Sequence, residues 1–367
     1  MMKQIDQTKQ QRIKTTSPFF RPGTETHERD QLFQLVNGGM GDYINWLAAI
    51  KWVAENYDYV RGHVVCPFWF VPVVENVLKD FPKWKAYPDD IPEKFANGYP
   101  IKSAPIHPIN ATMVHLLDLG FLYFAGVNPV PPEARVYPSL DLNLTDLPKS
   151  VRDLNYMVMT PGATAPSRTM PAKTFNQIKE YIISIGFTPV FLGNNKEDPR
   201  RLKVSFEEDY DFTGGINLLN KTTLLEAAKI MQYSHAVIGI DNGLLHLAAM
   251  TSAPIVFGYT IAGPLQRRPA RKFQSPIVEL YCEPEELPCT FCQERVRFFY
   301  DHDFQSCIYG DYECLKKLNA ESFNSAIDMI LKESGLTVAA LSDAKRKLDG
   351  NDAKGERQIS VGGYKCE

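Results

Sequence analysis

The sequence predicts an α/β protein with two parallel-sheet domains, and three observations support this prediction. The chain has 367 residues, which exceeds one ordinary core and suits two domains of about 150 residues each. Hydrophobic residues make up 44% of the chain and charged residues 23%, as is typical of globular proteins. Strand-like apolar runs alternate with amphipathic segments of helical period, and this order favours βαβ units.

The first predicted domain covers residues 31–150 and opens with a strand, a glycine-rich loop and a helix. The strand is QLFQLV over 31–36, the loop is NGGMGD, and apolar residues recur at helical spacing over 43–56. A second strand is expected at 63–66. Prolines are frequent from 82 to 108, so we expect long irregular connections in that stretch.

Composition marks the two ends of the chain and the domain boundary. Residues 1–30 are rich in Gln, Lys and Thr, and residues 336–367 in Lys, Asp and Gly, so both segments are predicted to be frayed tails. The stretch from 127 to 150 contains many prolines and turn residues and is expected to join the domains. The second domain is therefore predicted over 151–335.

The second domain shows its βαβ order more clearly than the first. A strand at 156–160 leads through the loop PGATAPSRTMP into a helix at 172–186 and a further strand at 188–193. Thr223 and Glu226 form a capping box at the start of the next helix. Two more strands follow, the buried run HAVIGI over 235–240 and PIVFGYT from residue 254.

Charge and hydropathy exclude several functional classes. The net charge is −3, with a pI near 6.2 and a mean hydropathy of −0.24, so the chain as a whole does not attract polyanions and we expect no nucleic-acid partner. The first residues lack the apolar stretch of a secretory signal, and no apolar run reaches the roughly 18 residues of a membrane-spanning helix. We expect a cytoplasmic protein that contacts membranes peripherally at most.

The junction between a buried strand and a helix at Asp241-Asn242-Gly243 is the most informative segment. Helix N-termini of such sheets present free N–H groups and the positive end of the helix dipole, where a diphosphate can bind. Gly243 allows close approach of a phosphate to the backbone. In the alternative interpretation, Asp241 or Asn242 only caps the helix and His246 only packs within it.

Four motifs occur in order along the chain: GGMGD from Gly38, PGA followed by Arg168, LG followed by Glu197, and DNGxxHLAA from Asp241. With these motifs the chain resembles family 9 of the glycosyltransferases, the heptosyltransferase-like enzymes of the GT-B fold. The resemblance implies two Rossmann-like domains facing each other across a cleft. The chain departs from the family pattern at Asn242, where Ser or Thr is usual, and at Met170, where Trp is common. Arg168 stands where some members have Lys.

The resemblance also implies an activity. It predicts an inverting transfer of a heptose-like sugar from a nucleoside diphosphate sugar, ADP-linked in the family, to a hydroxyl of a glycan or glycolipid acceptor such as a lipopolysaccharide. The N-terminal domain is expected to bind the acceptor and the C-terminal domain the donor.

Particular residues match the family's functional positions. Asp42 resembles the general base that takes the proton of the acceptor hydroxyl; alternatively, it only caps its helix. Arg168 is expected to stabilise the departing nucleoside diphosphate. Glu197 matches a glutamate near the donor, or is a charge on a surface loop, and Thr260 either binds a phosphate or caps a turn. The full donor-binding set expected is Gly41, Thr160, Gly162, Arg168, Gly193, Glu197, Asp241, Asn242, Gly243, His246 and Thr260.

Two Asp-x-Asp triplets, at 209–211 and 301–303, resemble the metal-binding motif of other glycosyltransferases. Neither follows a buried strand, so both are predicted to be surface turns, and no catalytic metal or other cofactor is expected. The basic run RRPARK at 267–272 follows the Thr260 loop. It is expected to touch an anionic acceptor or the donor phosphates, or to be a solvated face.

Cys289, Cys292, Cys307 and Cys314 lie in a short, turn-rich part of the segment 282–314. Four thiolates can close a tetrahedral structural zinc site, and the alternative is a set of reduced thiols, as expected in the cytoplasm. Cys282 is an alternative ligand, whereas Cys66 and Cys366 have no visible partner.

Two other functions stay open. A nucleotide-sugar epimerase of the same fold needs no acceptor, so release of nucleoside diphosphate that depends on an acceptor separates it from a transferase. A non-catalytic nucleotide-sugar-binding module binds the donor without turnover.

Overall fold

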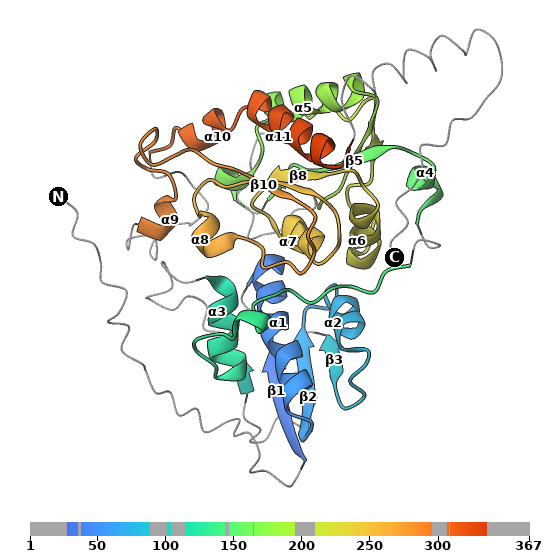
Figure 1. Ribbon diagram of the computed structural model, residues 1–367, viewed down its shortest axis with the longest axis vertical. Coiled ribbons are helices and arrows are strands. Elements are labelled where there is room, and N and C mark those ends of the chain that lie inside the picture. Colours follow the sequence, from blue (N-terminus) through green and yellow to red (C-terminus); the bar gives the residue numbers. More distant parts are fainter. Residues whose placement is uncertain are drawn as a thin grey trace. The chain divides into compact units, whose positions relative to one another are not determined.

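The computed structural model describes residues 28–35, 38–88, 101–103, 115–143, 147–163, 165–194, 210–295, 307 and 309–335 (Figure 1). The chain divides into two compact units. Unit 1 comprises residues 1–141 together with Leu265–Lys272, and unit 2 comprises residues 142–264 and 273–367. The boundary predicted after residue 150 lies in the same proline-rich stretch, a few residues further along the chain. The basic run, predicted to belong to the second domain, groups with unit 1.

Unit 1 contains one sheet of four parallel strands in the order β3-β2-β1-β4. Most buried residues of the central strands are apolar, with Gln31 and His63 as buried polar exceptions. Phe33 and Val64 form one pair of the β1–β2 register. The strands are β1 (Arg29–Gln34), β2 (Val60–Cys66), β3 (Lys85–Pro88) and β4 (Ile101–Ser103). The helices are α1 (Met40–Asn56), α2 (Val71–Leu78) and α3 (Leu116–Gly120), with short turns of other helix types at Phe121–Ala125 and Pro132–Ala134.

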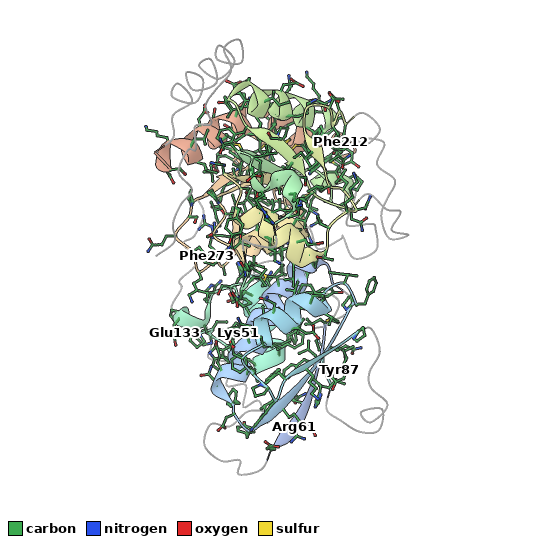
Figure 2. All side chains as sticks on the ribbon, turned by 90° about the vertical axis from the view of Figure 1, so that its right-hand side faces the viewer. Lys51, Arg61, Tyr87, Glu133, Phe212 and Phe273 are labelled. Carbon is green, nitrogen blue, oxygen red and sulfur yellow. The ribbon has the colours of Figure 1, made fainter. Side chains whose placement is uncertain are left out.

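Aromatic packing holds unit 1 together. The ring of Phe33 on β1 stacks on Trp84 at a centroid distance of 5.2 Å and an interplanar angle of 27°. A Cβ atom at Gly62 on β2 would lie 2.0 Å from the Trp84 ring, so only glycine allows this ring to cover the strand. Arg61 and Tyr87 belong to the neighbouring strands β2 and β3 (Figure 2).

Unit 2 contains six parallel strands in the order β10-β9-β8-β5-β6-β7. Counted within the unit, this order is 6-5-4-1-2-3, the doubly wound Rossmann arrangement. The strands are β5 (Tyr156–Thr160), β6 (Thr188–Phe191), β7 (Ile216–Asn217), β8 (Val237–Ile240), β9 (Ile255–Gly258) and β10 (Ile277–Leu280). The helices are α4 (Lys149–Arg152), α5 (Ala172–Ser184), α6 (Leu224–Gln232), α7 (Gly243–Ala249), α9 (Cys292–Arg295), α10 (Glu313–Lys317) and α11 (Ala320–Glu333), and α8 (Pro264–Arg267) leads from unit 2 into the segment grouped with unit 1.

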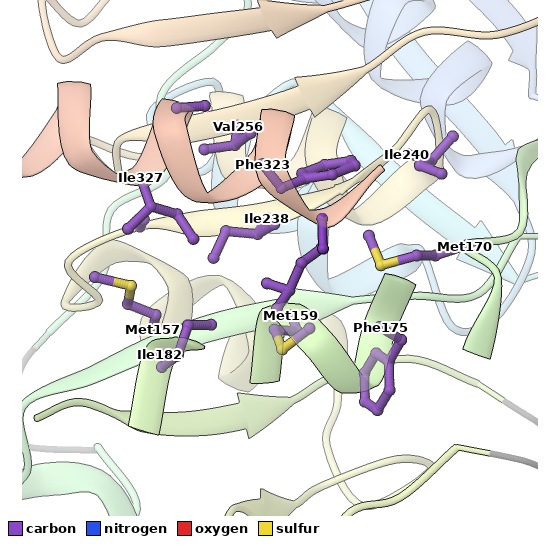
Figure 3. Close-up of a cluster of buried hydrophobic side chains, with 14 of the residues drawn as sticks. Met157, Met159, Met170, Phe175, Ile182, Ile238, Ile240, Val256, Phe323 and Ile327 are labelled. Atoms are coloured by element: carbon purple, nitrogen blue, oxygen red, sulfur yellow. The ribbon is translucent and has the colours of Figure 1, made fainter. Parts of the chain in front are cut away.

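The main core of unit 2 lies between its sheet and the helices α5 and α11 (Figure 3). Met159 on β5, Ile238 on β8 and Val256 on β9 are fully buried. Phe175 of α5 and Phe323 of α11 cover them and are also fully buried. The strands are apolar along their length because helices cover parallel sheets on both faces.

The predicted elements of unit 2 are confirmed, including the strand at 156–160 and the capping box of Thr223 and Glu226. Two predictions for unit 1 are wrong. The stretch 82–108, predicted to be irregular, contains β3 and β4, which are too short to show a period. The predicted N-terminal tail 1–30 overlaps β1, which begins at Arg29 because Arg29 and Asp30 pair with β2.

Two further statements concern the ends of the chain and membranes. The predicted tail 336–367 lies outside the described residues. Among the helices in the described part of the chain, none is both long and apolar enough to cross a membrane.

Candidate functional site

The switch point of the unit 2 sheet lies between β5 and β8, which are neighbours there although they are not consecutive along the chain. Ligands of doubly wound sheets bind at the carboxyl ends of the strands next to such a point, because the two connections leave it in opposite directions. Pro161 and Gly162 follow β5, and Asp241 and Asn242 follow β8. Most of the predicted donor-binding residues therefore belong to one edge of one sheet.

Asp241 is the centre of a buried polar group at this edge. Its side chain is 3% exposed, with Oδ2 3.4 Å from Nη1 of Arg168 and Oδ1 3.5 Å from Nε2 of His246. Arg168 lies on the short 3₁₀ turn Pro166–Arg168, and its side chain is 21% exposed. A buried carboxylate holds a guanidinium in place because separating them would leave a charge without a partner in a low dielectric. Arg168 is thus positioned and still partly open to solvent.

Asn242 is the N-cap of α7. Its Oδ1 accepts hydrogen bonds from the N–H groups of Leu244 at 2.9 Å and Leu245 at 3.1 Å, and its Nδ2 donates to the carbonyl of Thr160 at 2.9 Å. The cap thus occupies two of the amides at the helix start where a diphosphate is expected. Asn242 therefore caps α7, as one interpretation of the sequence required, and binding of a diphosphate at this helix start stays a prediction.

Two threonines of the predicted donor set hold the loops together. Thr160 Oγ1 donates to the carbonyl of Ile238 at 3.3 Å, and Thr260 Oγ1 donates to the carbonyl of Ser167 at 2.8 Å. Both threonines are 1% exposed. The bond from Thr260 fastens the loop after β9 to the turn that carries Arg168.

A pocket with a cavity volume of about 40 Å³ opens at the carboxyl ends of β5 and β6 in unit 2. Gly193, which has a φ of +155° that L side chains rarely adopt, lies in its wall. Phe212 (Figure 2) and Tyr210 supply aromatic rings. The complete lining is Pro161, Gly162, Gly193, Asn194, Tyr210, Phe212 and Leu219.

The segment that carries these rings is fixed from behind. Tyr210 donates to the carbonyl of Met170 at 2.5 Å, and its ring lies 4.6 Å from that of Phe175. Asp211 accepts from the buried Lys179 at 2.5 Å and from Thr213. The hydrogen bond from Lys179 is the largest of several effects that lower the pKa of Asp211 to about 2. Asp211, one half of the first Asp-x-Asp triplet, thus has a structural role.

In unit 1, Asp42 has two partners. Its Oδ2 accepts from the N–H of Gly39 at 2.8 Å, and its Oδ1 lies 3.5 Å from Nη1 of Arg267. The side chain is 23% exposed, so the carboxylate is accessible. Asp42 therefore caps α1, as one interpretation of the sequence required, while its second oxygen faces a guanidinium from the basic run.

The basic run is attached to unit 1 by its backbone. Tyr137 donates its N–H to the carbonyl of Ala270, and Nε2 of His115 donates to the carbonyl of Arg268 at 2.7 Å. Burial lowers the pKa of Arg271 to about 10. The run is therefore not a uniformly solvated face.

The cysteine-rich segment supports the Thr260 loop. Phe291, between Cys289 and Cys292, donates its N–H to the carbonyl of Thr260 at 3.1 Å, and Glu294 accepts from the N–H of Gly263 at 2.6 Å. Burial raises the pKa of Cys292 to about 11 and that of Cys314 to about 12, with the neighbouring thiols adding to the effect.

The predicted structural zinc site has no support from this geometry. No three His, Cys, Asp or Glu side chains in the described ranges are placed to hold a metal ion. The zinc site stays a prediction. Glu197, the triplet 301–303 and Cys366 lie outside the described residues.

Three contributions to the site were missed by sequence analysis. Arg267 as the partner of Asp42 was within the basic run, but the pairing joins residues far apart in sequence. Tyr210 and Phe212 alternate with Asp209 and Asp211, and the sequence was interpreted there only for its Asp-x-Asp pattern. Glu294 had no sequence signal, because its partner is a backbone amide.

The central part of the chain is similar to a known protein family. The model of the family "Glycosyltransferase family 9 (heptosyltransferase)" matches residues 131–289. Lipooligosaccharide heptosyltransferase 2 of Haemophilus influenzae is 28% identical over 124 residues, which are 33% of this chain and 35% of that protein. The match thus spans about a third of the length of this curated relative.

Solved structures show the same fold. The iron-containing dodecameric glycosyltransferase TibC from enterotoxigenic E. coli H10407 has a TM-score of 0.66 at 17% identity, covering 84% of this chain and 77% of TibC. A second TibC structure, described as a heptosyltransferase in complex with ADP-D-β-D-heptose, has the same TM-score. The ADP-heptose LPS heptosyltransferase II of E. coli has a TM-score of 0.58 at 14% identity, covering 83% of this chain and 99% of that one. The fold is therefore of the GT-B type, with two Rossmann-like units.

Proposed function

We propose that the chain is an inverting glycosyltransferase of family 9, because the model of that family matches residues 131–289. It moves a heptose-like sugar from a nucleoside diphosphate to an acceptor hydroxyl, as on a lipopolysaccharide-type glycan. The observation that carries this proposal is the buried group Arg168–Asp241–His246 at the switch point of the unit 2 sheet. It holds a partly exposed guanidinium where a diphosphate is expected to bind.

The proposed reaction is a direct displacement. Asp42 takes the proton of the acceptor hydroxyl while its oxygen attacks the anomeric carbon. The bond from the anomeric carbon to the phosphate oxygen breaks on the opposite side, which inverts the configuration. The leaving nucleoside diphosphate gains negative charge, and Arg168 stabilises it.

We place the nucleoside base in the aromatic pocket of unit 2. The two aromatic rings that line this pocket suit a planar base, because base–aromatic stacking contributes about 1–3 kcal/mol. Adenine is the proposed base, since TibC has been described in complex with an ADP-linked heptose. ADP-heptose should therefore stabilise the protein more than UDP-, GDP- or CMP-linked sugars in a thermal-shift panel. At 100 times its Kd, it should add about 2.7 kcal/mol to the free energy of unfolding of the protein without ligand.

Phe212→Leu tests the pocket, because it keeps most of the volume and removes the ring. We expect the Kd for ADP to rise about tenfold, measured by calorimetry. Phe187→Leu is the control: Phe187 is a buried phenylalanine of unit 2 that does not line the pocket, whereas Phe212 is partly buried. Equal loss of ADP affinity in both variants would show that stability, and not stacking, is responsible.

We also propose that the transfer step requires no metal ion at the donor phosphates. Supporting this, Asp211 is bound to Lys179 and Thr213 and is not arranged as a ligand, while Arg168 supplies a positive charge. Turnover should persist in excess EDTA over short times. Immediate loss restored by Mg²⁺ or Mn²⁺ would contradict this.

Production of an epimerised donor without acceptor would indicate an epimerase instead.

A further inference from the structure

The turn between β2 and α2 carries two neighbouring exposed aromatic side chains. Phe68 is 69% exposed and Trp69 is 38% exposed. The other large apolar side chains that are exposed in the described residues occur singly along the sequence. Scattered exposed apolar residues are ordinary, whereas adjacent ones indicate a binding surface.

Trp69 is held in its exposed position. Its ring lies 5.9 Å from the ring of Tyr43 and 5.8 Å from that of Phe70, which is fully buried. The N–H of Phe70 donates to the carbonyl of Pro67 at 2.8 Å, and the carbonyl of Phe70 accepts from the N–H of Val73. The turn is therefore built to present a ring at the surface, and little conformational entropy is lost when a ligand stacks on it.

This aromatic pair lies at the same edge of the unit 1 sheet as the proposed catalytic base. β1 and β2 are parallel neighbours, so the loop that precedes α1 and the turn that precedes α2 leave the same edge of the sheet. Tyr43, which contacts Trp69, directly follows Asp42 in the sequence. Arg267 lies 3.5 Å from Asp42. One edge of unit 1 thus combines aromatic faces, a carboxylate and a guanidinium.

We infer that Phe68 and Trp69 form an acceptor subsite on which a sugar ring of a glycan stacks, with its hydroxyls directed to Asp42 and Arg267. This inference rests on the proposed function and names the class of acceptor. A pyranose ring has a face of C–H groups that packs on an aromatic ring and a rim of hydroxyls that need polar partners. The surface offers both. An acyl chain or an apolar peptide would cover the rings but would desolvate Asp42 and Arg267 without replacing their hydrogen bonds.

A glycan array of immobilised bacterial oligosaccharides, probed with the full-length protein, tests the inference. Wild-type protein is expected to give signals that fall about tenfold in Trp69→Ala and that Trp69→Phe largely retains. Phe68→Ala should lower the same signals without a folding defect, because this side chain is mostly exposed. Met329→Ala is the matched control, since Met329 is 52% exposed on α11 of unit 2.

Three outcomes overturn the inference. Wild-type protein that binds ADP but no immobilised glycan would do so, as would glycan signals unchanged in Phe68→Ala and Trp69→Ala. The third is loss of binding to phosphatidylglycerol–phosphatidylethanolamine vesicles in these variants with unaltered glycan signals, which would identify a membrane contact. Calorimetry with ADP separates the two proposals: failure of wild-type protein to bind ADP contradicts the proposed function, whereas intact ADP binding confines the failure to the acceptor subsite.

Discussion

Unit 1 and unit 2 both contain a parallel sheet, and the first four strands of each unit have the same order. The units differ in how deeply the acidic side chain near the carboxyl ends of their strands is buried. In unit 2, Asp241 is 3% exposed and is held by Arg168 and His246. In unit 1, Asp42 is 23% exposed and lies at an edge that also carries exposed aromatic rings. The difference agrees with a donor side that must hold one fixed ligand and an acceptor side that stays accessible.

The difference also shows in how far apart the partners are in sequence. Arg168 reaches Asp241 from a 3₁₀ turn and His246 reaches it from α7, both in unit 2. Both lie in the part of the chain that the family model matches. Arg267 reaches Asp42 from 225 positions along the chain.

The largest expected effect is on Asp42. In Asp42→Asn the amide oxygen can still accept the N–H of Gly39, the N-cap residue of α1, but the side chain cannot accept a proton. We expect kcat to fall by about 10² to 10⁴, with the Kd for ADP and the melting temperature nearly unchanged. Near-normal kcat with a lowered melting temperature would instead assign Asp42 a structural role only.

Arg168 should give the next largest effect, and on the other unit. Arg168→Ala removes the charge that stabilises the leaving group and is expected to lower kcat/KM by about 10² to 10³. Arg168→Lys keeps the charge but not the planar fork, so we expect an intermediate value. The double variant with Asp241→Asn should lose less than the sum of the single changes, because the two side chains interact. Strict additivity would show that they act independently.

A smaller effect is expected at Glu294, which supports unit 2 from the cysteine-rich segment. Glu294→Gln keeps an acceptor for the N–H of Gly263 but removes its charge, and charged hydrogen bonds are about twice as strong as neutral ones. We expect the Kd for ADP to rise several-fold, measured by calorimetry. Glu321→Gln is the control, since Glu321 is an exposed glutamate at the start of α11 in unit 2. An unchanged Kd would separate this segment from donor binding.

The sequence predicted unit 2 better than unit 1 for physical reasons. The runs YMVMT and HAVIGI are buried on both faces and bounded by turn residues, so local pattern was sufficient. β3 and β4 are four and three residues long, too short for a period, and they depend on pairing with distant strands. The motif at Asp241 revealed the buried group, but not that Asn242 would occupy the amides of Leu244 and Leu245. Capping competes with ligand binding for the same donors, and sequence alone does not decide between them.

The smallest expected effect concerns the pH dependence of stability, through Asp211 behind the aromatic pocket. Its pKa in the folded protein is lowered to about 2, chiefly because Lys179 donates a hydrogen bond to it. A lowered folded-state pKa means that the ionised carboxylate stabilises the fold above pH 4 and that this contribution is lost as the pH falls from about 4 towards 2. Asp211→Asn should therefore have a lower free energy of unfolding than wild type at pH 7. This difference should become smaller as the pH falls from about 4 towards 2. Urea unfolding at several pH values measures this difference, with Asp153→Asn, an exposed aspartate of unit 2, as the control. Suppose that the difference in free energy of unfolding between wild type and Asp211→Asn stays constant from pH 7 to pH 2. The ion pair with Lys179 would then not hold the pocket segment. The aromatic wall would depend on Tyr210 and its hydrogen bond to Met170 alone.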